Sequence, residues 1–260
     1  MAEIPDRGQG NLPGLSPTRI GMLRRRGIYL LPNLFTTAAL FAGFFAIVQA
    51  MNGRFAVSAV AIIVAMVLDG LDGRVARLTR TQSEFGAEYD SLSDMVSFGA
   101  APALVIYEWA LKGLGRFGWI AAFVYCAGAA LRLARFNVNL EVVDKRFFQG
   151  LPSPAAAALV AGFVWLVQDN KIPLDEYRLP WVAAFLALYT GLTMVSNVPF
   201  YSFKDINFRK AVPFWGILLI VLAFVLVAFD PPIVLFALFC AYGLSGYVVW
   251  FFRRRPRRVP

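Results

Sequence analysis

Apolar residues along this chain gather in eight long runs, separated by short polar segments or segments rich in glycine and proline. Each run approaches the roughly 20 residues that an α-helix needs to cross the hydrocarbon core of a bilayer. The pattern therefore predicts an all-α fold, a polytopic membrane bundle of about eight transmembrane helices. The expected spans are 29–51, 55–79, 86–111, 117–139, 152–169, 179–199, 211–229 and 232–252.

We expect one transmembrane domain over residues 28–252, with a core at about 29–200 and extra helices at about 211–252. Residues 1–27 are rich in Gly, Pro and Arg and predict a disordered cytoplasmic N-terminus. Residues 253–260 predict a basic cytoplasmic tail that attracts anionic lipid. The last two spans carry no motif, so they either complete the bundle or form the face of a homodimer.

The composition agrees with a membrane protein, because 59% of the residues are hydrophobic and the mean hydropathy is +0.62. The net charge of +9 is typical of basic cytoplasmic loops and does not indicate nucleic-acid binding. Histidine is absent, which excludes a Ser-His-Asp triad, a His-ligated zinc and a His general base. Any general base is therefore expected to be a carboxylate.

Lysine and arginine sort by loop in a way that predicts the orientation of the chain. Most of the 25 lie in the N-terminus, in alternate loops or in the C-terminus. The opposite loops hold only Arg54, Lys112, Arg116, Lys171 and Arg178. By the positive-inside rule both termini are cytoplasmic, and we expect an integral protein of the cell (inner) membrane.

Four aspartates interrupt the apolar pattern between the second and third spans. Asp69 and Asp72 are spaced i,i+3, and Asp90 and Asp94 are spaced i,i+4, so each pair shares one helix face. Ionised carboxylates beside lipid-length segments are costly and need a partner. Carboxylate oxygens are the usual ligands of Mg²⁺ and similar hard cations, and two such metals suit a reaction at a pyrophosphate.

Two other interpretations of the aspartates remain open at this point. An aspartate pair at a helix end is commonly a solvated cap, and intramembrane carboxylates also mark the ion pathway of a cation transporter. The depth of the site argues against a transporter. Ala56–Leu68 spans about 20 Å of helix, so Asp69 is expected near the cytoplasmic boundary, whereas transporters hold their sites near the midplane.

The small and basic residues around the aspartates complete a recognisable spacing. Gly73, Ala76 and Arg77 lie on the face of Asp69 and Asp72, and Gly86 precedes Asp90 by one turn. This spacing resembles, position for position, the signature of the CDP-alcohol phosphotransferases. Those are integral membrane enzymes that exchange the CMP of a CDP-linked lipid for an acceptor alcohol.

The resemblance implies roles for individual residues. Asp69, Asp72 and Asp90 would hold two divalent ions, Mg²⁺ or Mn²⁺, with Asp94 on the second ion and also acting as the general base. The CDP-linked lipid would be bound by Pro32, Asn33, Gly73, Ala76, Arg77, Ser83 and Gly86.

Three further stretches resemble the phosphatidylserine synthase branch of this superfamily: LRLARFNVN, FFQGLPSPAAAA and MVSNVPFYSFK. The branch implies transfer of a phosphatidyl group from CDP-diacylglycerol to L-serine. Arg132 and Arg135 share a helix face and would bind the acceptor, because a guanidinium group pairs well with a carboxylate. They would equally suit the phosphate of glycerol 3-phosphate or of an inositol compound, or anchor the helix at the membrane surface.

Overall fold

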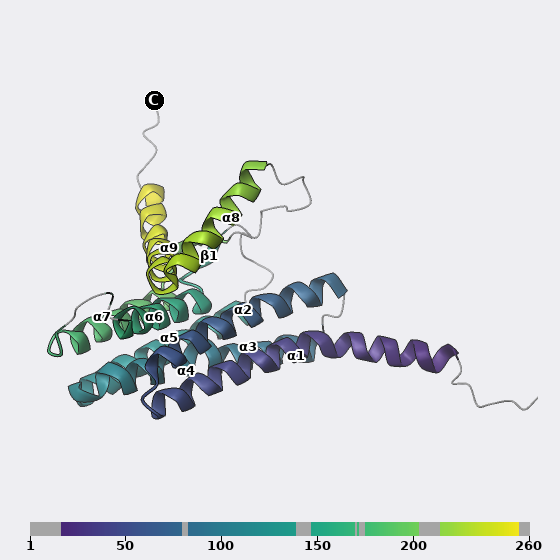
Figure 1. Ribbon diagram of the computed structural model, residues 1–260, viewed down its shortest axis with the longest axis horizontal. Helices are drawn as coiled ribbons and strands as arrows, with labels where there is room; N and C mark the ends of the chain where they lie inside the picture. The colour runs from purple at the N-terminus through teal and green to yellow at the C-terminus, as the bar shows by residue number, and fades with distance from the viewer. Residues whose placement is uncertain are drawn as a thin grey trace, which may run out of the picture.

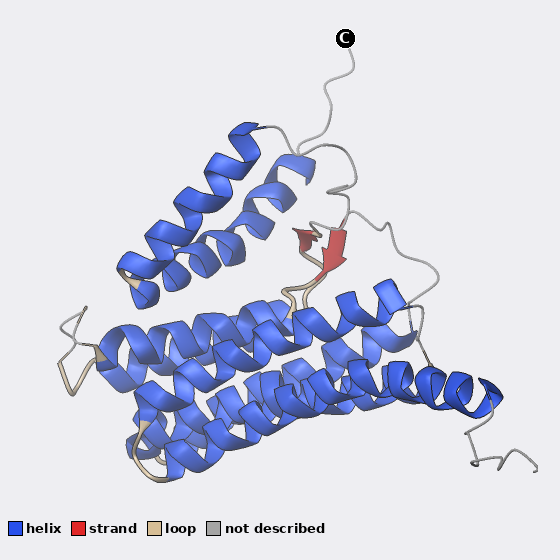
Figure 2. Cartoon of the chain, turned by 45° about the vertical axis from the view of Figure 1, so that its right-hand side comes forward, coloured by secondary structure: helices blue, strands red, loops and turns tan. Residues whose placement is uncertain are grey.

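The computed structural model describes residues 17–79, 83–138, 147–169, 171, 175–202 and 214–254, most of which are helical (Figure 1). The longer elements are α1 (Pro17–Met51), α2 (Phe55–Thr79), α3 (Glu84–Asp94), α5 (Arg116–Val138), α6 (Ser153–Gln168), α7 (Leu179–Val195), α8 (Phe214–Phe229) and α9 (Pro231–Arg254). Figures 1 and 2 show α1 to α7 lying roughly along one direction, with the α8–α9 pair inclined to them. The layout is a helical bundle with a tilted hairpin on one side.

Four of the described helices are long and apolar enough to cross a membrane: Asn33–Met51, Phe55–Thr79, Arg116–Val138 and Pro231–Phe252. Ser153–Gln168 and Leu179–Val195 are apolar but shorter. The chain is therefore an integral membrane protein built of helices. The count of eight spans and the cytoplasmic termini stay predictions.

The first helix is longer than the expected span, because it begins at Pro17 and not near residue 29. Proline is favoured in the first turn of a helix, and the Leu and Arg residues that follow are good helix formers. The predicted disordered N-terminus falls partly on residues 1–16, which lie outside the described residues. Over 17–27 the structure has helix.

The third expected span is a chain of short helical segments. After α3 come the π-helix η1 (Met95–Ala100), α4 (Ala101–Ile106) and a second π-helix, η2 (Tyr107–Leu111). A short 3₁₀ turn, η3 (Lys112–Leu114), then leads to Gly115, whose φ is 57°. A π-turn adds one residue to the helical repeat, and such turns are frequent at functional sites.

The structure is mostly helical, as expected of an all-α fold, and adds one short strand pair that the sequence analysis did not predict. β1 (Phe147–Gln149) and β2 (Pro199–Tyr201) form an antiparallel pair in which Phe148 lies opposite Phe200. Aromatic residues are good strand formers. Gly150, with φ 77°, turns the chain from β1 towards α6, and a Cβ there would collide with the Met194 carbonyl. This pair joins the start of α6 to the end of α7.

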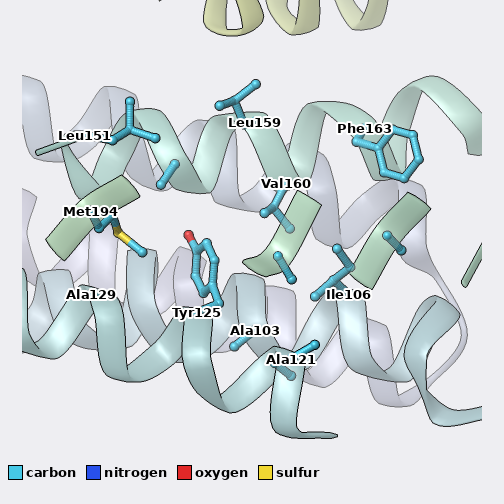
Figure 3. Close-up of a cluster of buried hydrophobic side chains, with 14 of the residues drawn as sticks. Ala103, Ile106, Ala121, Tyr125, Ala129, Leu151, Leu159, Val160, Phe163 and Met194 are labelled. Carbon is cyan, nitrogen blue, oxygen red and sulfur yellow. The ribbon is translucent and has the colours of Figure 1, made fainter. Parts of the chain in front are cut away.

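The main core lies between α4, α5, α6 and α7 and is built from small and medium apolar residues (Figure 3). Alanines at 121, 129, 155, 156, 183, 184 and 187 are almost fully buried and allow close approach of the helices. Gly128 on α5 faces Gly191 on α7, and a Cβ at either position would press on the backbone of the other helix. α5 and α7 therefore cross in close backbone contact.

The last helix packs on the bundle through α6, α7 and β2. The Tyr189 hydroxyl donates to the Gly243 carbonyl (2.9 Å), and the hydroxyls of Thr193 and Tyr247 are 2.7 Å apart. At its N-terminal end, Asp230 pairs with Lys171 at 2.7 Å. The Lys171 ammonium holds the pKa of the Asp230 carboxyl below its usual value. α9 therefore completes the bundle, and a homodimer face stays a prediction.

We expect Gly128→Leu to destabilise the protein, because the side chain would meet the Gly191 backbone. Overpacking of this kind typically costs about 1–3 kcal/mol. Thermal unfolding in detergent would measure the loss. Gly113→Leu is the matched control, since a Cβ at Gly113 meets nothing within 4 Å. Equal stability of both variants would contradict a tight α5–α7 crossing.

Candidate metal centre and active site

Three aspartates from two helices converge at one end of the bundle. Asp69 and Asp72 on α2 and Asp90 on α3 each offer a carboxylate oxygen, and these oxygens lie within 4.8 Å of one another. Asp72 is buried, and Asp69 and Asp90 are half-buried. Helical spacing places each carboxylate, but only the packing of α2 and α3 on α1 brings the two helices' carboxylates together.

Hydrogen bonds from α1 and α3 fix this arrangement. The Thr36 hydroxyl donates to Asp72 Oδ2 at 2.8 Å, inside the protein. The Ser93 hydroxyl donates in turn to the Thr36 carbonyl at 3.1 Å. Because Ser93 lies between Asp90 and Asp94, it ties the helix of the second aspartate pair to the residue that orients Asp72.

Asp94 lies beside this group but is not part of it. Its carboxyl interacts most strongly with the carboxyl of Asp69, and more weakly with the carboxyl of Asp90 and with the Arg132 guanidinium of α5. Asp94 thus interacts with a guanidinium group, whereas Asp90 interacts with Asp69 and Asp72. The spacing in the sequence could not separate the two.

The donor set fits a divalent cation. Carboxylates this close repel one another unless a cation lies between them. Within the described residues, Asp90 Oδ1 and Asp94 Oδ1 are buried and have no hydrogen-bond partner. Buried carboxylate oxygens left without donors are available as metal ligands.

The small residues leave space in front of the centre. A Cβ added at Gly73 would meet nothing within 4 Å, so the side of α2 next to Asp72 is open. Ala76 is half-buried on the same face. Arg77 is exposed, and its Nε donates to the Gly73 carbonyl at 2.9 Å. A ligand could therefore approach the backbone between the aspartates and a guanidinium group.

A second group of expected ligand-binding residues lies where α3 begins. Ser83 caps α3, and its hydroxyl accepts from the Gly86 amide at 3.0 Å. A Cβ at Gly86 would lie 3.5 Å from the side-chain oxygen of Asn33 on α1. Ser83, Gly86 and Asn33 are thus neighbours. Pro32 lies on α1, but its side chain falls outside the described residues.

The two arginines expected at the acceptor site diverge. Arg132 Nη1 donates to the buried Ser153 hydroxyl at 2.9 Å, and its guanidinium interacts with Asp94. Its Nε is buried and has no partner within the described residues. Arg135 turns instead towards the end of α7, with Nη1 3.3 Å from Asn197 Oδ1. Only Arg132 lies beside the centre.

Sequence reasoning missed two supporting residues, Ser93 and Ser153. Ser93 stands between two aspartates of the signature, and Ser153 stands between two prolines that open a helix. Neither pattern specifies the hydrogen-bond partner, because Ser93 bonds to Thr36 on α1 and Ser153 bonds to Arg132 on α5, and both helices are distant in sequence.

Fold and centre together define a helical integral membrane protein with a carboxylate site suited to a divalent metal. The model of the CDP-alcohol phosphatidyltransferase family matches residues 29–195. The chain belongs to this family, whose members are generally dependent on a divalent metal. The matched segment ends at the last residue of α7, so α8 and α9 lie beyond it.

Several curated proteins similar to this chain carry the name CDP-diacylglycerol–serine O-phosphatidyltransferase. One from Helicobacter pylori is 36% identical over 226 residues, covering 86% of this chain and 92% of the relative. One from Mycobacterium tuberculosis is 36% identical over 184 residues, or 67% of this chain and 63% of the relative. One from Methanocaldococcus jannaschii is 39% identical over 144 residues, covering 55% and 63%.

We expect Asp72→Asn to abolish high-affinity Mn²⁺ binding, because a neutral amide is a much weaker ligand. Thr36→Val should lower the Mn²⁺ affinity by about tenfold or more, since residues that orient metal ligands typically contribute about 10–100-fold to metal affinity. Mn²⁺ titration followed by electron paramagnetic resonance would measure both.

Asp175→Asn is the control for this titration, because Asp175 is exposed and pairs only with Arg178 in the described residues. It should bind Mn²⁺ like the wild type. Wild-type affinity in Asp72→Asn would remove Asp72 from the metal site.

Proposed function

We propose that this protein is a phosphatidylserine synthase, which transfers the phosphatidyl group of CDP-diacylglycerol to L-serine and releases CMP. The family membership and the names of its relatives support the reaction class and the substrates. The observation that supports the mechanism is that the Asp94 carboxyl interacts electrostatically both with the Asp69 carboxyl and with the Arg132 guanidinium.

The metal centre would be formed by Asp69, Asp72 and Asp90, with Asp94 adjacent. We propose two ions, Mg²⁺ or Mn²⁺. When bound, they would neutralise the pyrophosphate of the lipid and stabilise the charge that develops on the departing CMP. Gly73, Ala76 and Arg77 would receive the pyrophosphate, and Pro32, Asn33, Ser83 and Gly86 the cytidine end of the nucleotide.

Asp94 would act as the general base. The serine hydroxyl oxygen forms a bond to the β-phosphorus while its proton passes to the Asp94 carboxylate. The bond between the β-phosphorus and the bridging oxygen breaks, and the electron pair leaves with CMP. An isolated aspartate is a weak base, with a pKa of about 3.9. Its position, and a site partly shielded from water, would make it effective.

Arg132 would bind the serine carboxylate. Its Nη1 already bonds to Ser153, but the buried Nε has no partner within the described residues. A donor in that position suits an anionic oxygen, because an unpaired buried donor is costly. The same guanidinium interacts with Asp94. Serine held by its carboxylate at Arg132 would therefore have its hydroxyl near the base.

We further propose the topology in which this chemistry takes place. The protein would cross the inner membrane eight times with both termini in the cytoplasm, which follows from the distribution of Lys and Arg. The aspartates would then lie at the depth of the lipid headgroups on the cytoplasmic side. CDP-diacylglycerol could enter sideways from the bilayer while serine arrives from the cytoplasm.

The decisive experiment offers radiolabelled CDP-diacylglycerol to the purified protein with serine, glycerol 3-phosphate or inositol phosphate in separate reactions. We expect CMP release and formation of phosphatidylserine with serine alone. Release with glycerol 3-phosphate and not with serine would assign a different acceptor. No release with any acceptor, together with cation flux in vesicles, would favour the transporter.

Asp94→Asn should lower kcat by about 10²–10⁴-fold, which is the usual effect of removing a general base. Binding of CDP-diacylglycerol should persist, as measured by equilibrium binding of the labelled lipid. A variant that loses nucleotide-lipid binding along with turnover would make Asp94 chiefly a metal ligand, and the assignment of the base would be wrong.

Arg132→Lys should raise the apparent KM for serine or abolish transfer, because lysine keeps the charge but lacks the planar fork. Arg135→Lys is the matched control, since Arg135 bonds to Asn197 and to the Ser196 carbonyl. We expect Arg135→Lys to change the apparent KM for serine less than Arg132→Lys does. Initial rates measured at varied serine concentration would give both KM values. Wild-type serine dependence in Arg132→Lys would remove the proposed acceptor site.

A further inference from the structure

The helix that carries Asp94 and the helix that carries Arg132 meet through a series of polar contacts. Ser91 and Asn137 exchange hydrogen bonds at the end of the bundle that holds the aspartates. Next along the two helices, the Asp94 carboxyl interacts electrostatically with the Arg132 guanidinium. The third contact lies deeper, where the Tyr125 hydroxyl donates to the Phe98 carbonyl at 2.9 Å. The order of these contacts means that α3–η1 and α5 run antiparallel.

Tyr125 is an unusual residue for its position. It has no exposed surface and lies in the main core among Leu151, Val160 and Met194 (Figure 3). Phenylalanine would fill nearly the same volume without a hydroxyl. A buried hydroxyl is costly to place in an apolar core unless it is hydrogen-bonded. The bond to Phe98 is therefore the feature that distinguishes tyrosine here from a purely space-filling aromatic residue.

The acceptor of this bond lies in the π-helix that directly follows Asp94. η1 shows the π pattern, since the Ala101 amide donates to the Val96 carbonyl five residues earlier. On its other side, η1 is bonded to α1, because the buried Ser97 hydroxyl donates to the Ala39 carbonyl at 3.1 Å. η1 is thus held between α1 and α5, and the position of Asp94 is fixed relative to both.

On α5, Tyr125 and Arg132 are seven residues apart, two turns along one face. Phe98 follows Asp94 by one turn. The helices touch beside the Tyr125–Phe98 bond, because a Cβ at Gly99, the residue after Phe98, would lie 3.3 Å from the Ala129 Cβ. The Tyr125–Phe98 bond therefore sets how far along its axis α5 lies against η1, and with it the offset of Arg132 from Asp94.

We propose that Tyr125 is a positioning residue for the transfer reaction, which sets the register of Arg132 against Asp94 through its hydrogen bond to the Phe98 carbonyl. This inference rests on the proposed roles of Asp94 as base and Arg132 as acceptor ligand. It adds a residue that touches neither substrate nor metal. A serine held at Arg132 presents its hydroxyl to Asp94 only if the two helices keep this register.

The test is Tyr125→Phe in the full-length protein in lipid vesicles. Misplacing a reacting group by about 1 Å can cost on the order of 10²-fold, so we expect kcat to fall by about 10- to 100-fold. The apparent KM for CDP-diacylglycerol and the Mn²⁺ affinity should not change, because the carboxylate group on α2 and α3 is held by Thr36 and Ser93. Unchanged kcat would overturn the proposal.

Tyr189→Phe is the matched control. It also removes one hydrogen bond from a tyrosine to a backbone carbonyl between two helices, in this case Gly243 on α9. We expect it to lose a similar amount of thermal stability while keeping wild-type kcat. Equal losses of kcat in both variants would mean that any weakening of the bundle slows the reaction, and the specific role of Tyr125 would be wrong.

A double-mutant cycle separates positioning from general stability. If Tyr125 acts through Arg132, adding Tyr125→Phe to Arg132→Lys should cost little further activity, since coupled residues are not additive. Additive losses would overturn the proposal. So would a Tyr125→Phe protein that does not fold while Tyr189→Phe does, because the bond would then serve the bundle as a whole.

The failure of this inference can be told from the failure of the proposed function. If the wild-type protein releases CMP with an acceptor other than serine, the serine assignment fails, and the same comparison on that acceptor still tests Tyr125. If no acceptor supports release, both the function and the role of Tyr125 fall.

Discussion

The structure depends on keeping four carboxylates together at one end of an apolar bundle. Asp69, Asp72 and Asp90 place oxygens within 4.8 Å of one another, and Asp94 adds a fourth carboxyl next to Asp69. Like charges at these distances oppose folding unless cations and hydrogen bonds offset them. The protein itself supplies the Thr36 hydroxyl and the Arg132 guanidinium. Bound divalent ions would offset the remaining negative charge of the carboxylates.

This requirement explains why polar residues appear where they do in an otherwise apolar core. Buried serines and threonines are placed at the contacts of α1 with α2, α3 and η1, where they donate to a carboxylate or to a backbone carbonyl. Each such bond satisfies a group that would be costly to bury alone. The α5–α7 crossing, by contrast, relies on small residues, which bring the two backbones into close contact. Hydrogen bonds from buried hydroxyls therefore hold the helices near the site, whereas small residues allow close helix packing between α5 and α7.

α9 stands apart from this centre in sequence but not in space. The segment matched by the family model ends with α7, yet α9 packs on α6 and α7 and bonds to Tyr189 and Thr193. Tyr242 on α9 donates to the Tyr201 carbonyl and lines a pocket with Pro152 and Pro154, the residues on either side of Ser153. The helix is therefore a wall of the bundle on the side of the proposed acceptor site.

The sequence by itself determined the helical membrane character, the approximate positions of most helices and the family, because these follow from hydrophobic run length and a fixed spacing of Asp, Gly and Arg. It could not place Asp94 apart from Asp90, or Arg132 apart from Arg135, since residues on one helix face look equivalent until another helix packs against them. It also did not indicate the β1–β2 pair, the hydrogen bond that Ser153 accepts from Arg132 or the one that Tyr125 donates to Phe98. Each of these contacts forms only because a segment distant in sequence brings its partner within hydrogen-bonding distance, about 3 Å, and only the tertiary structure decides which segment that is.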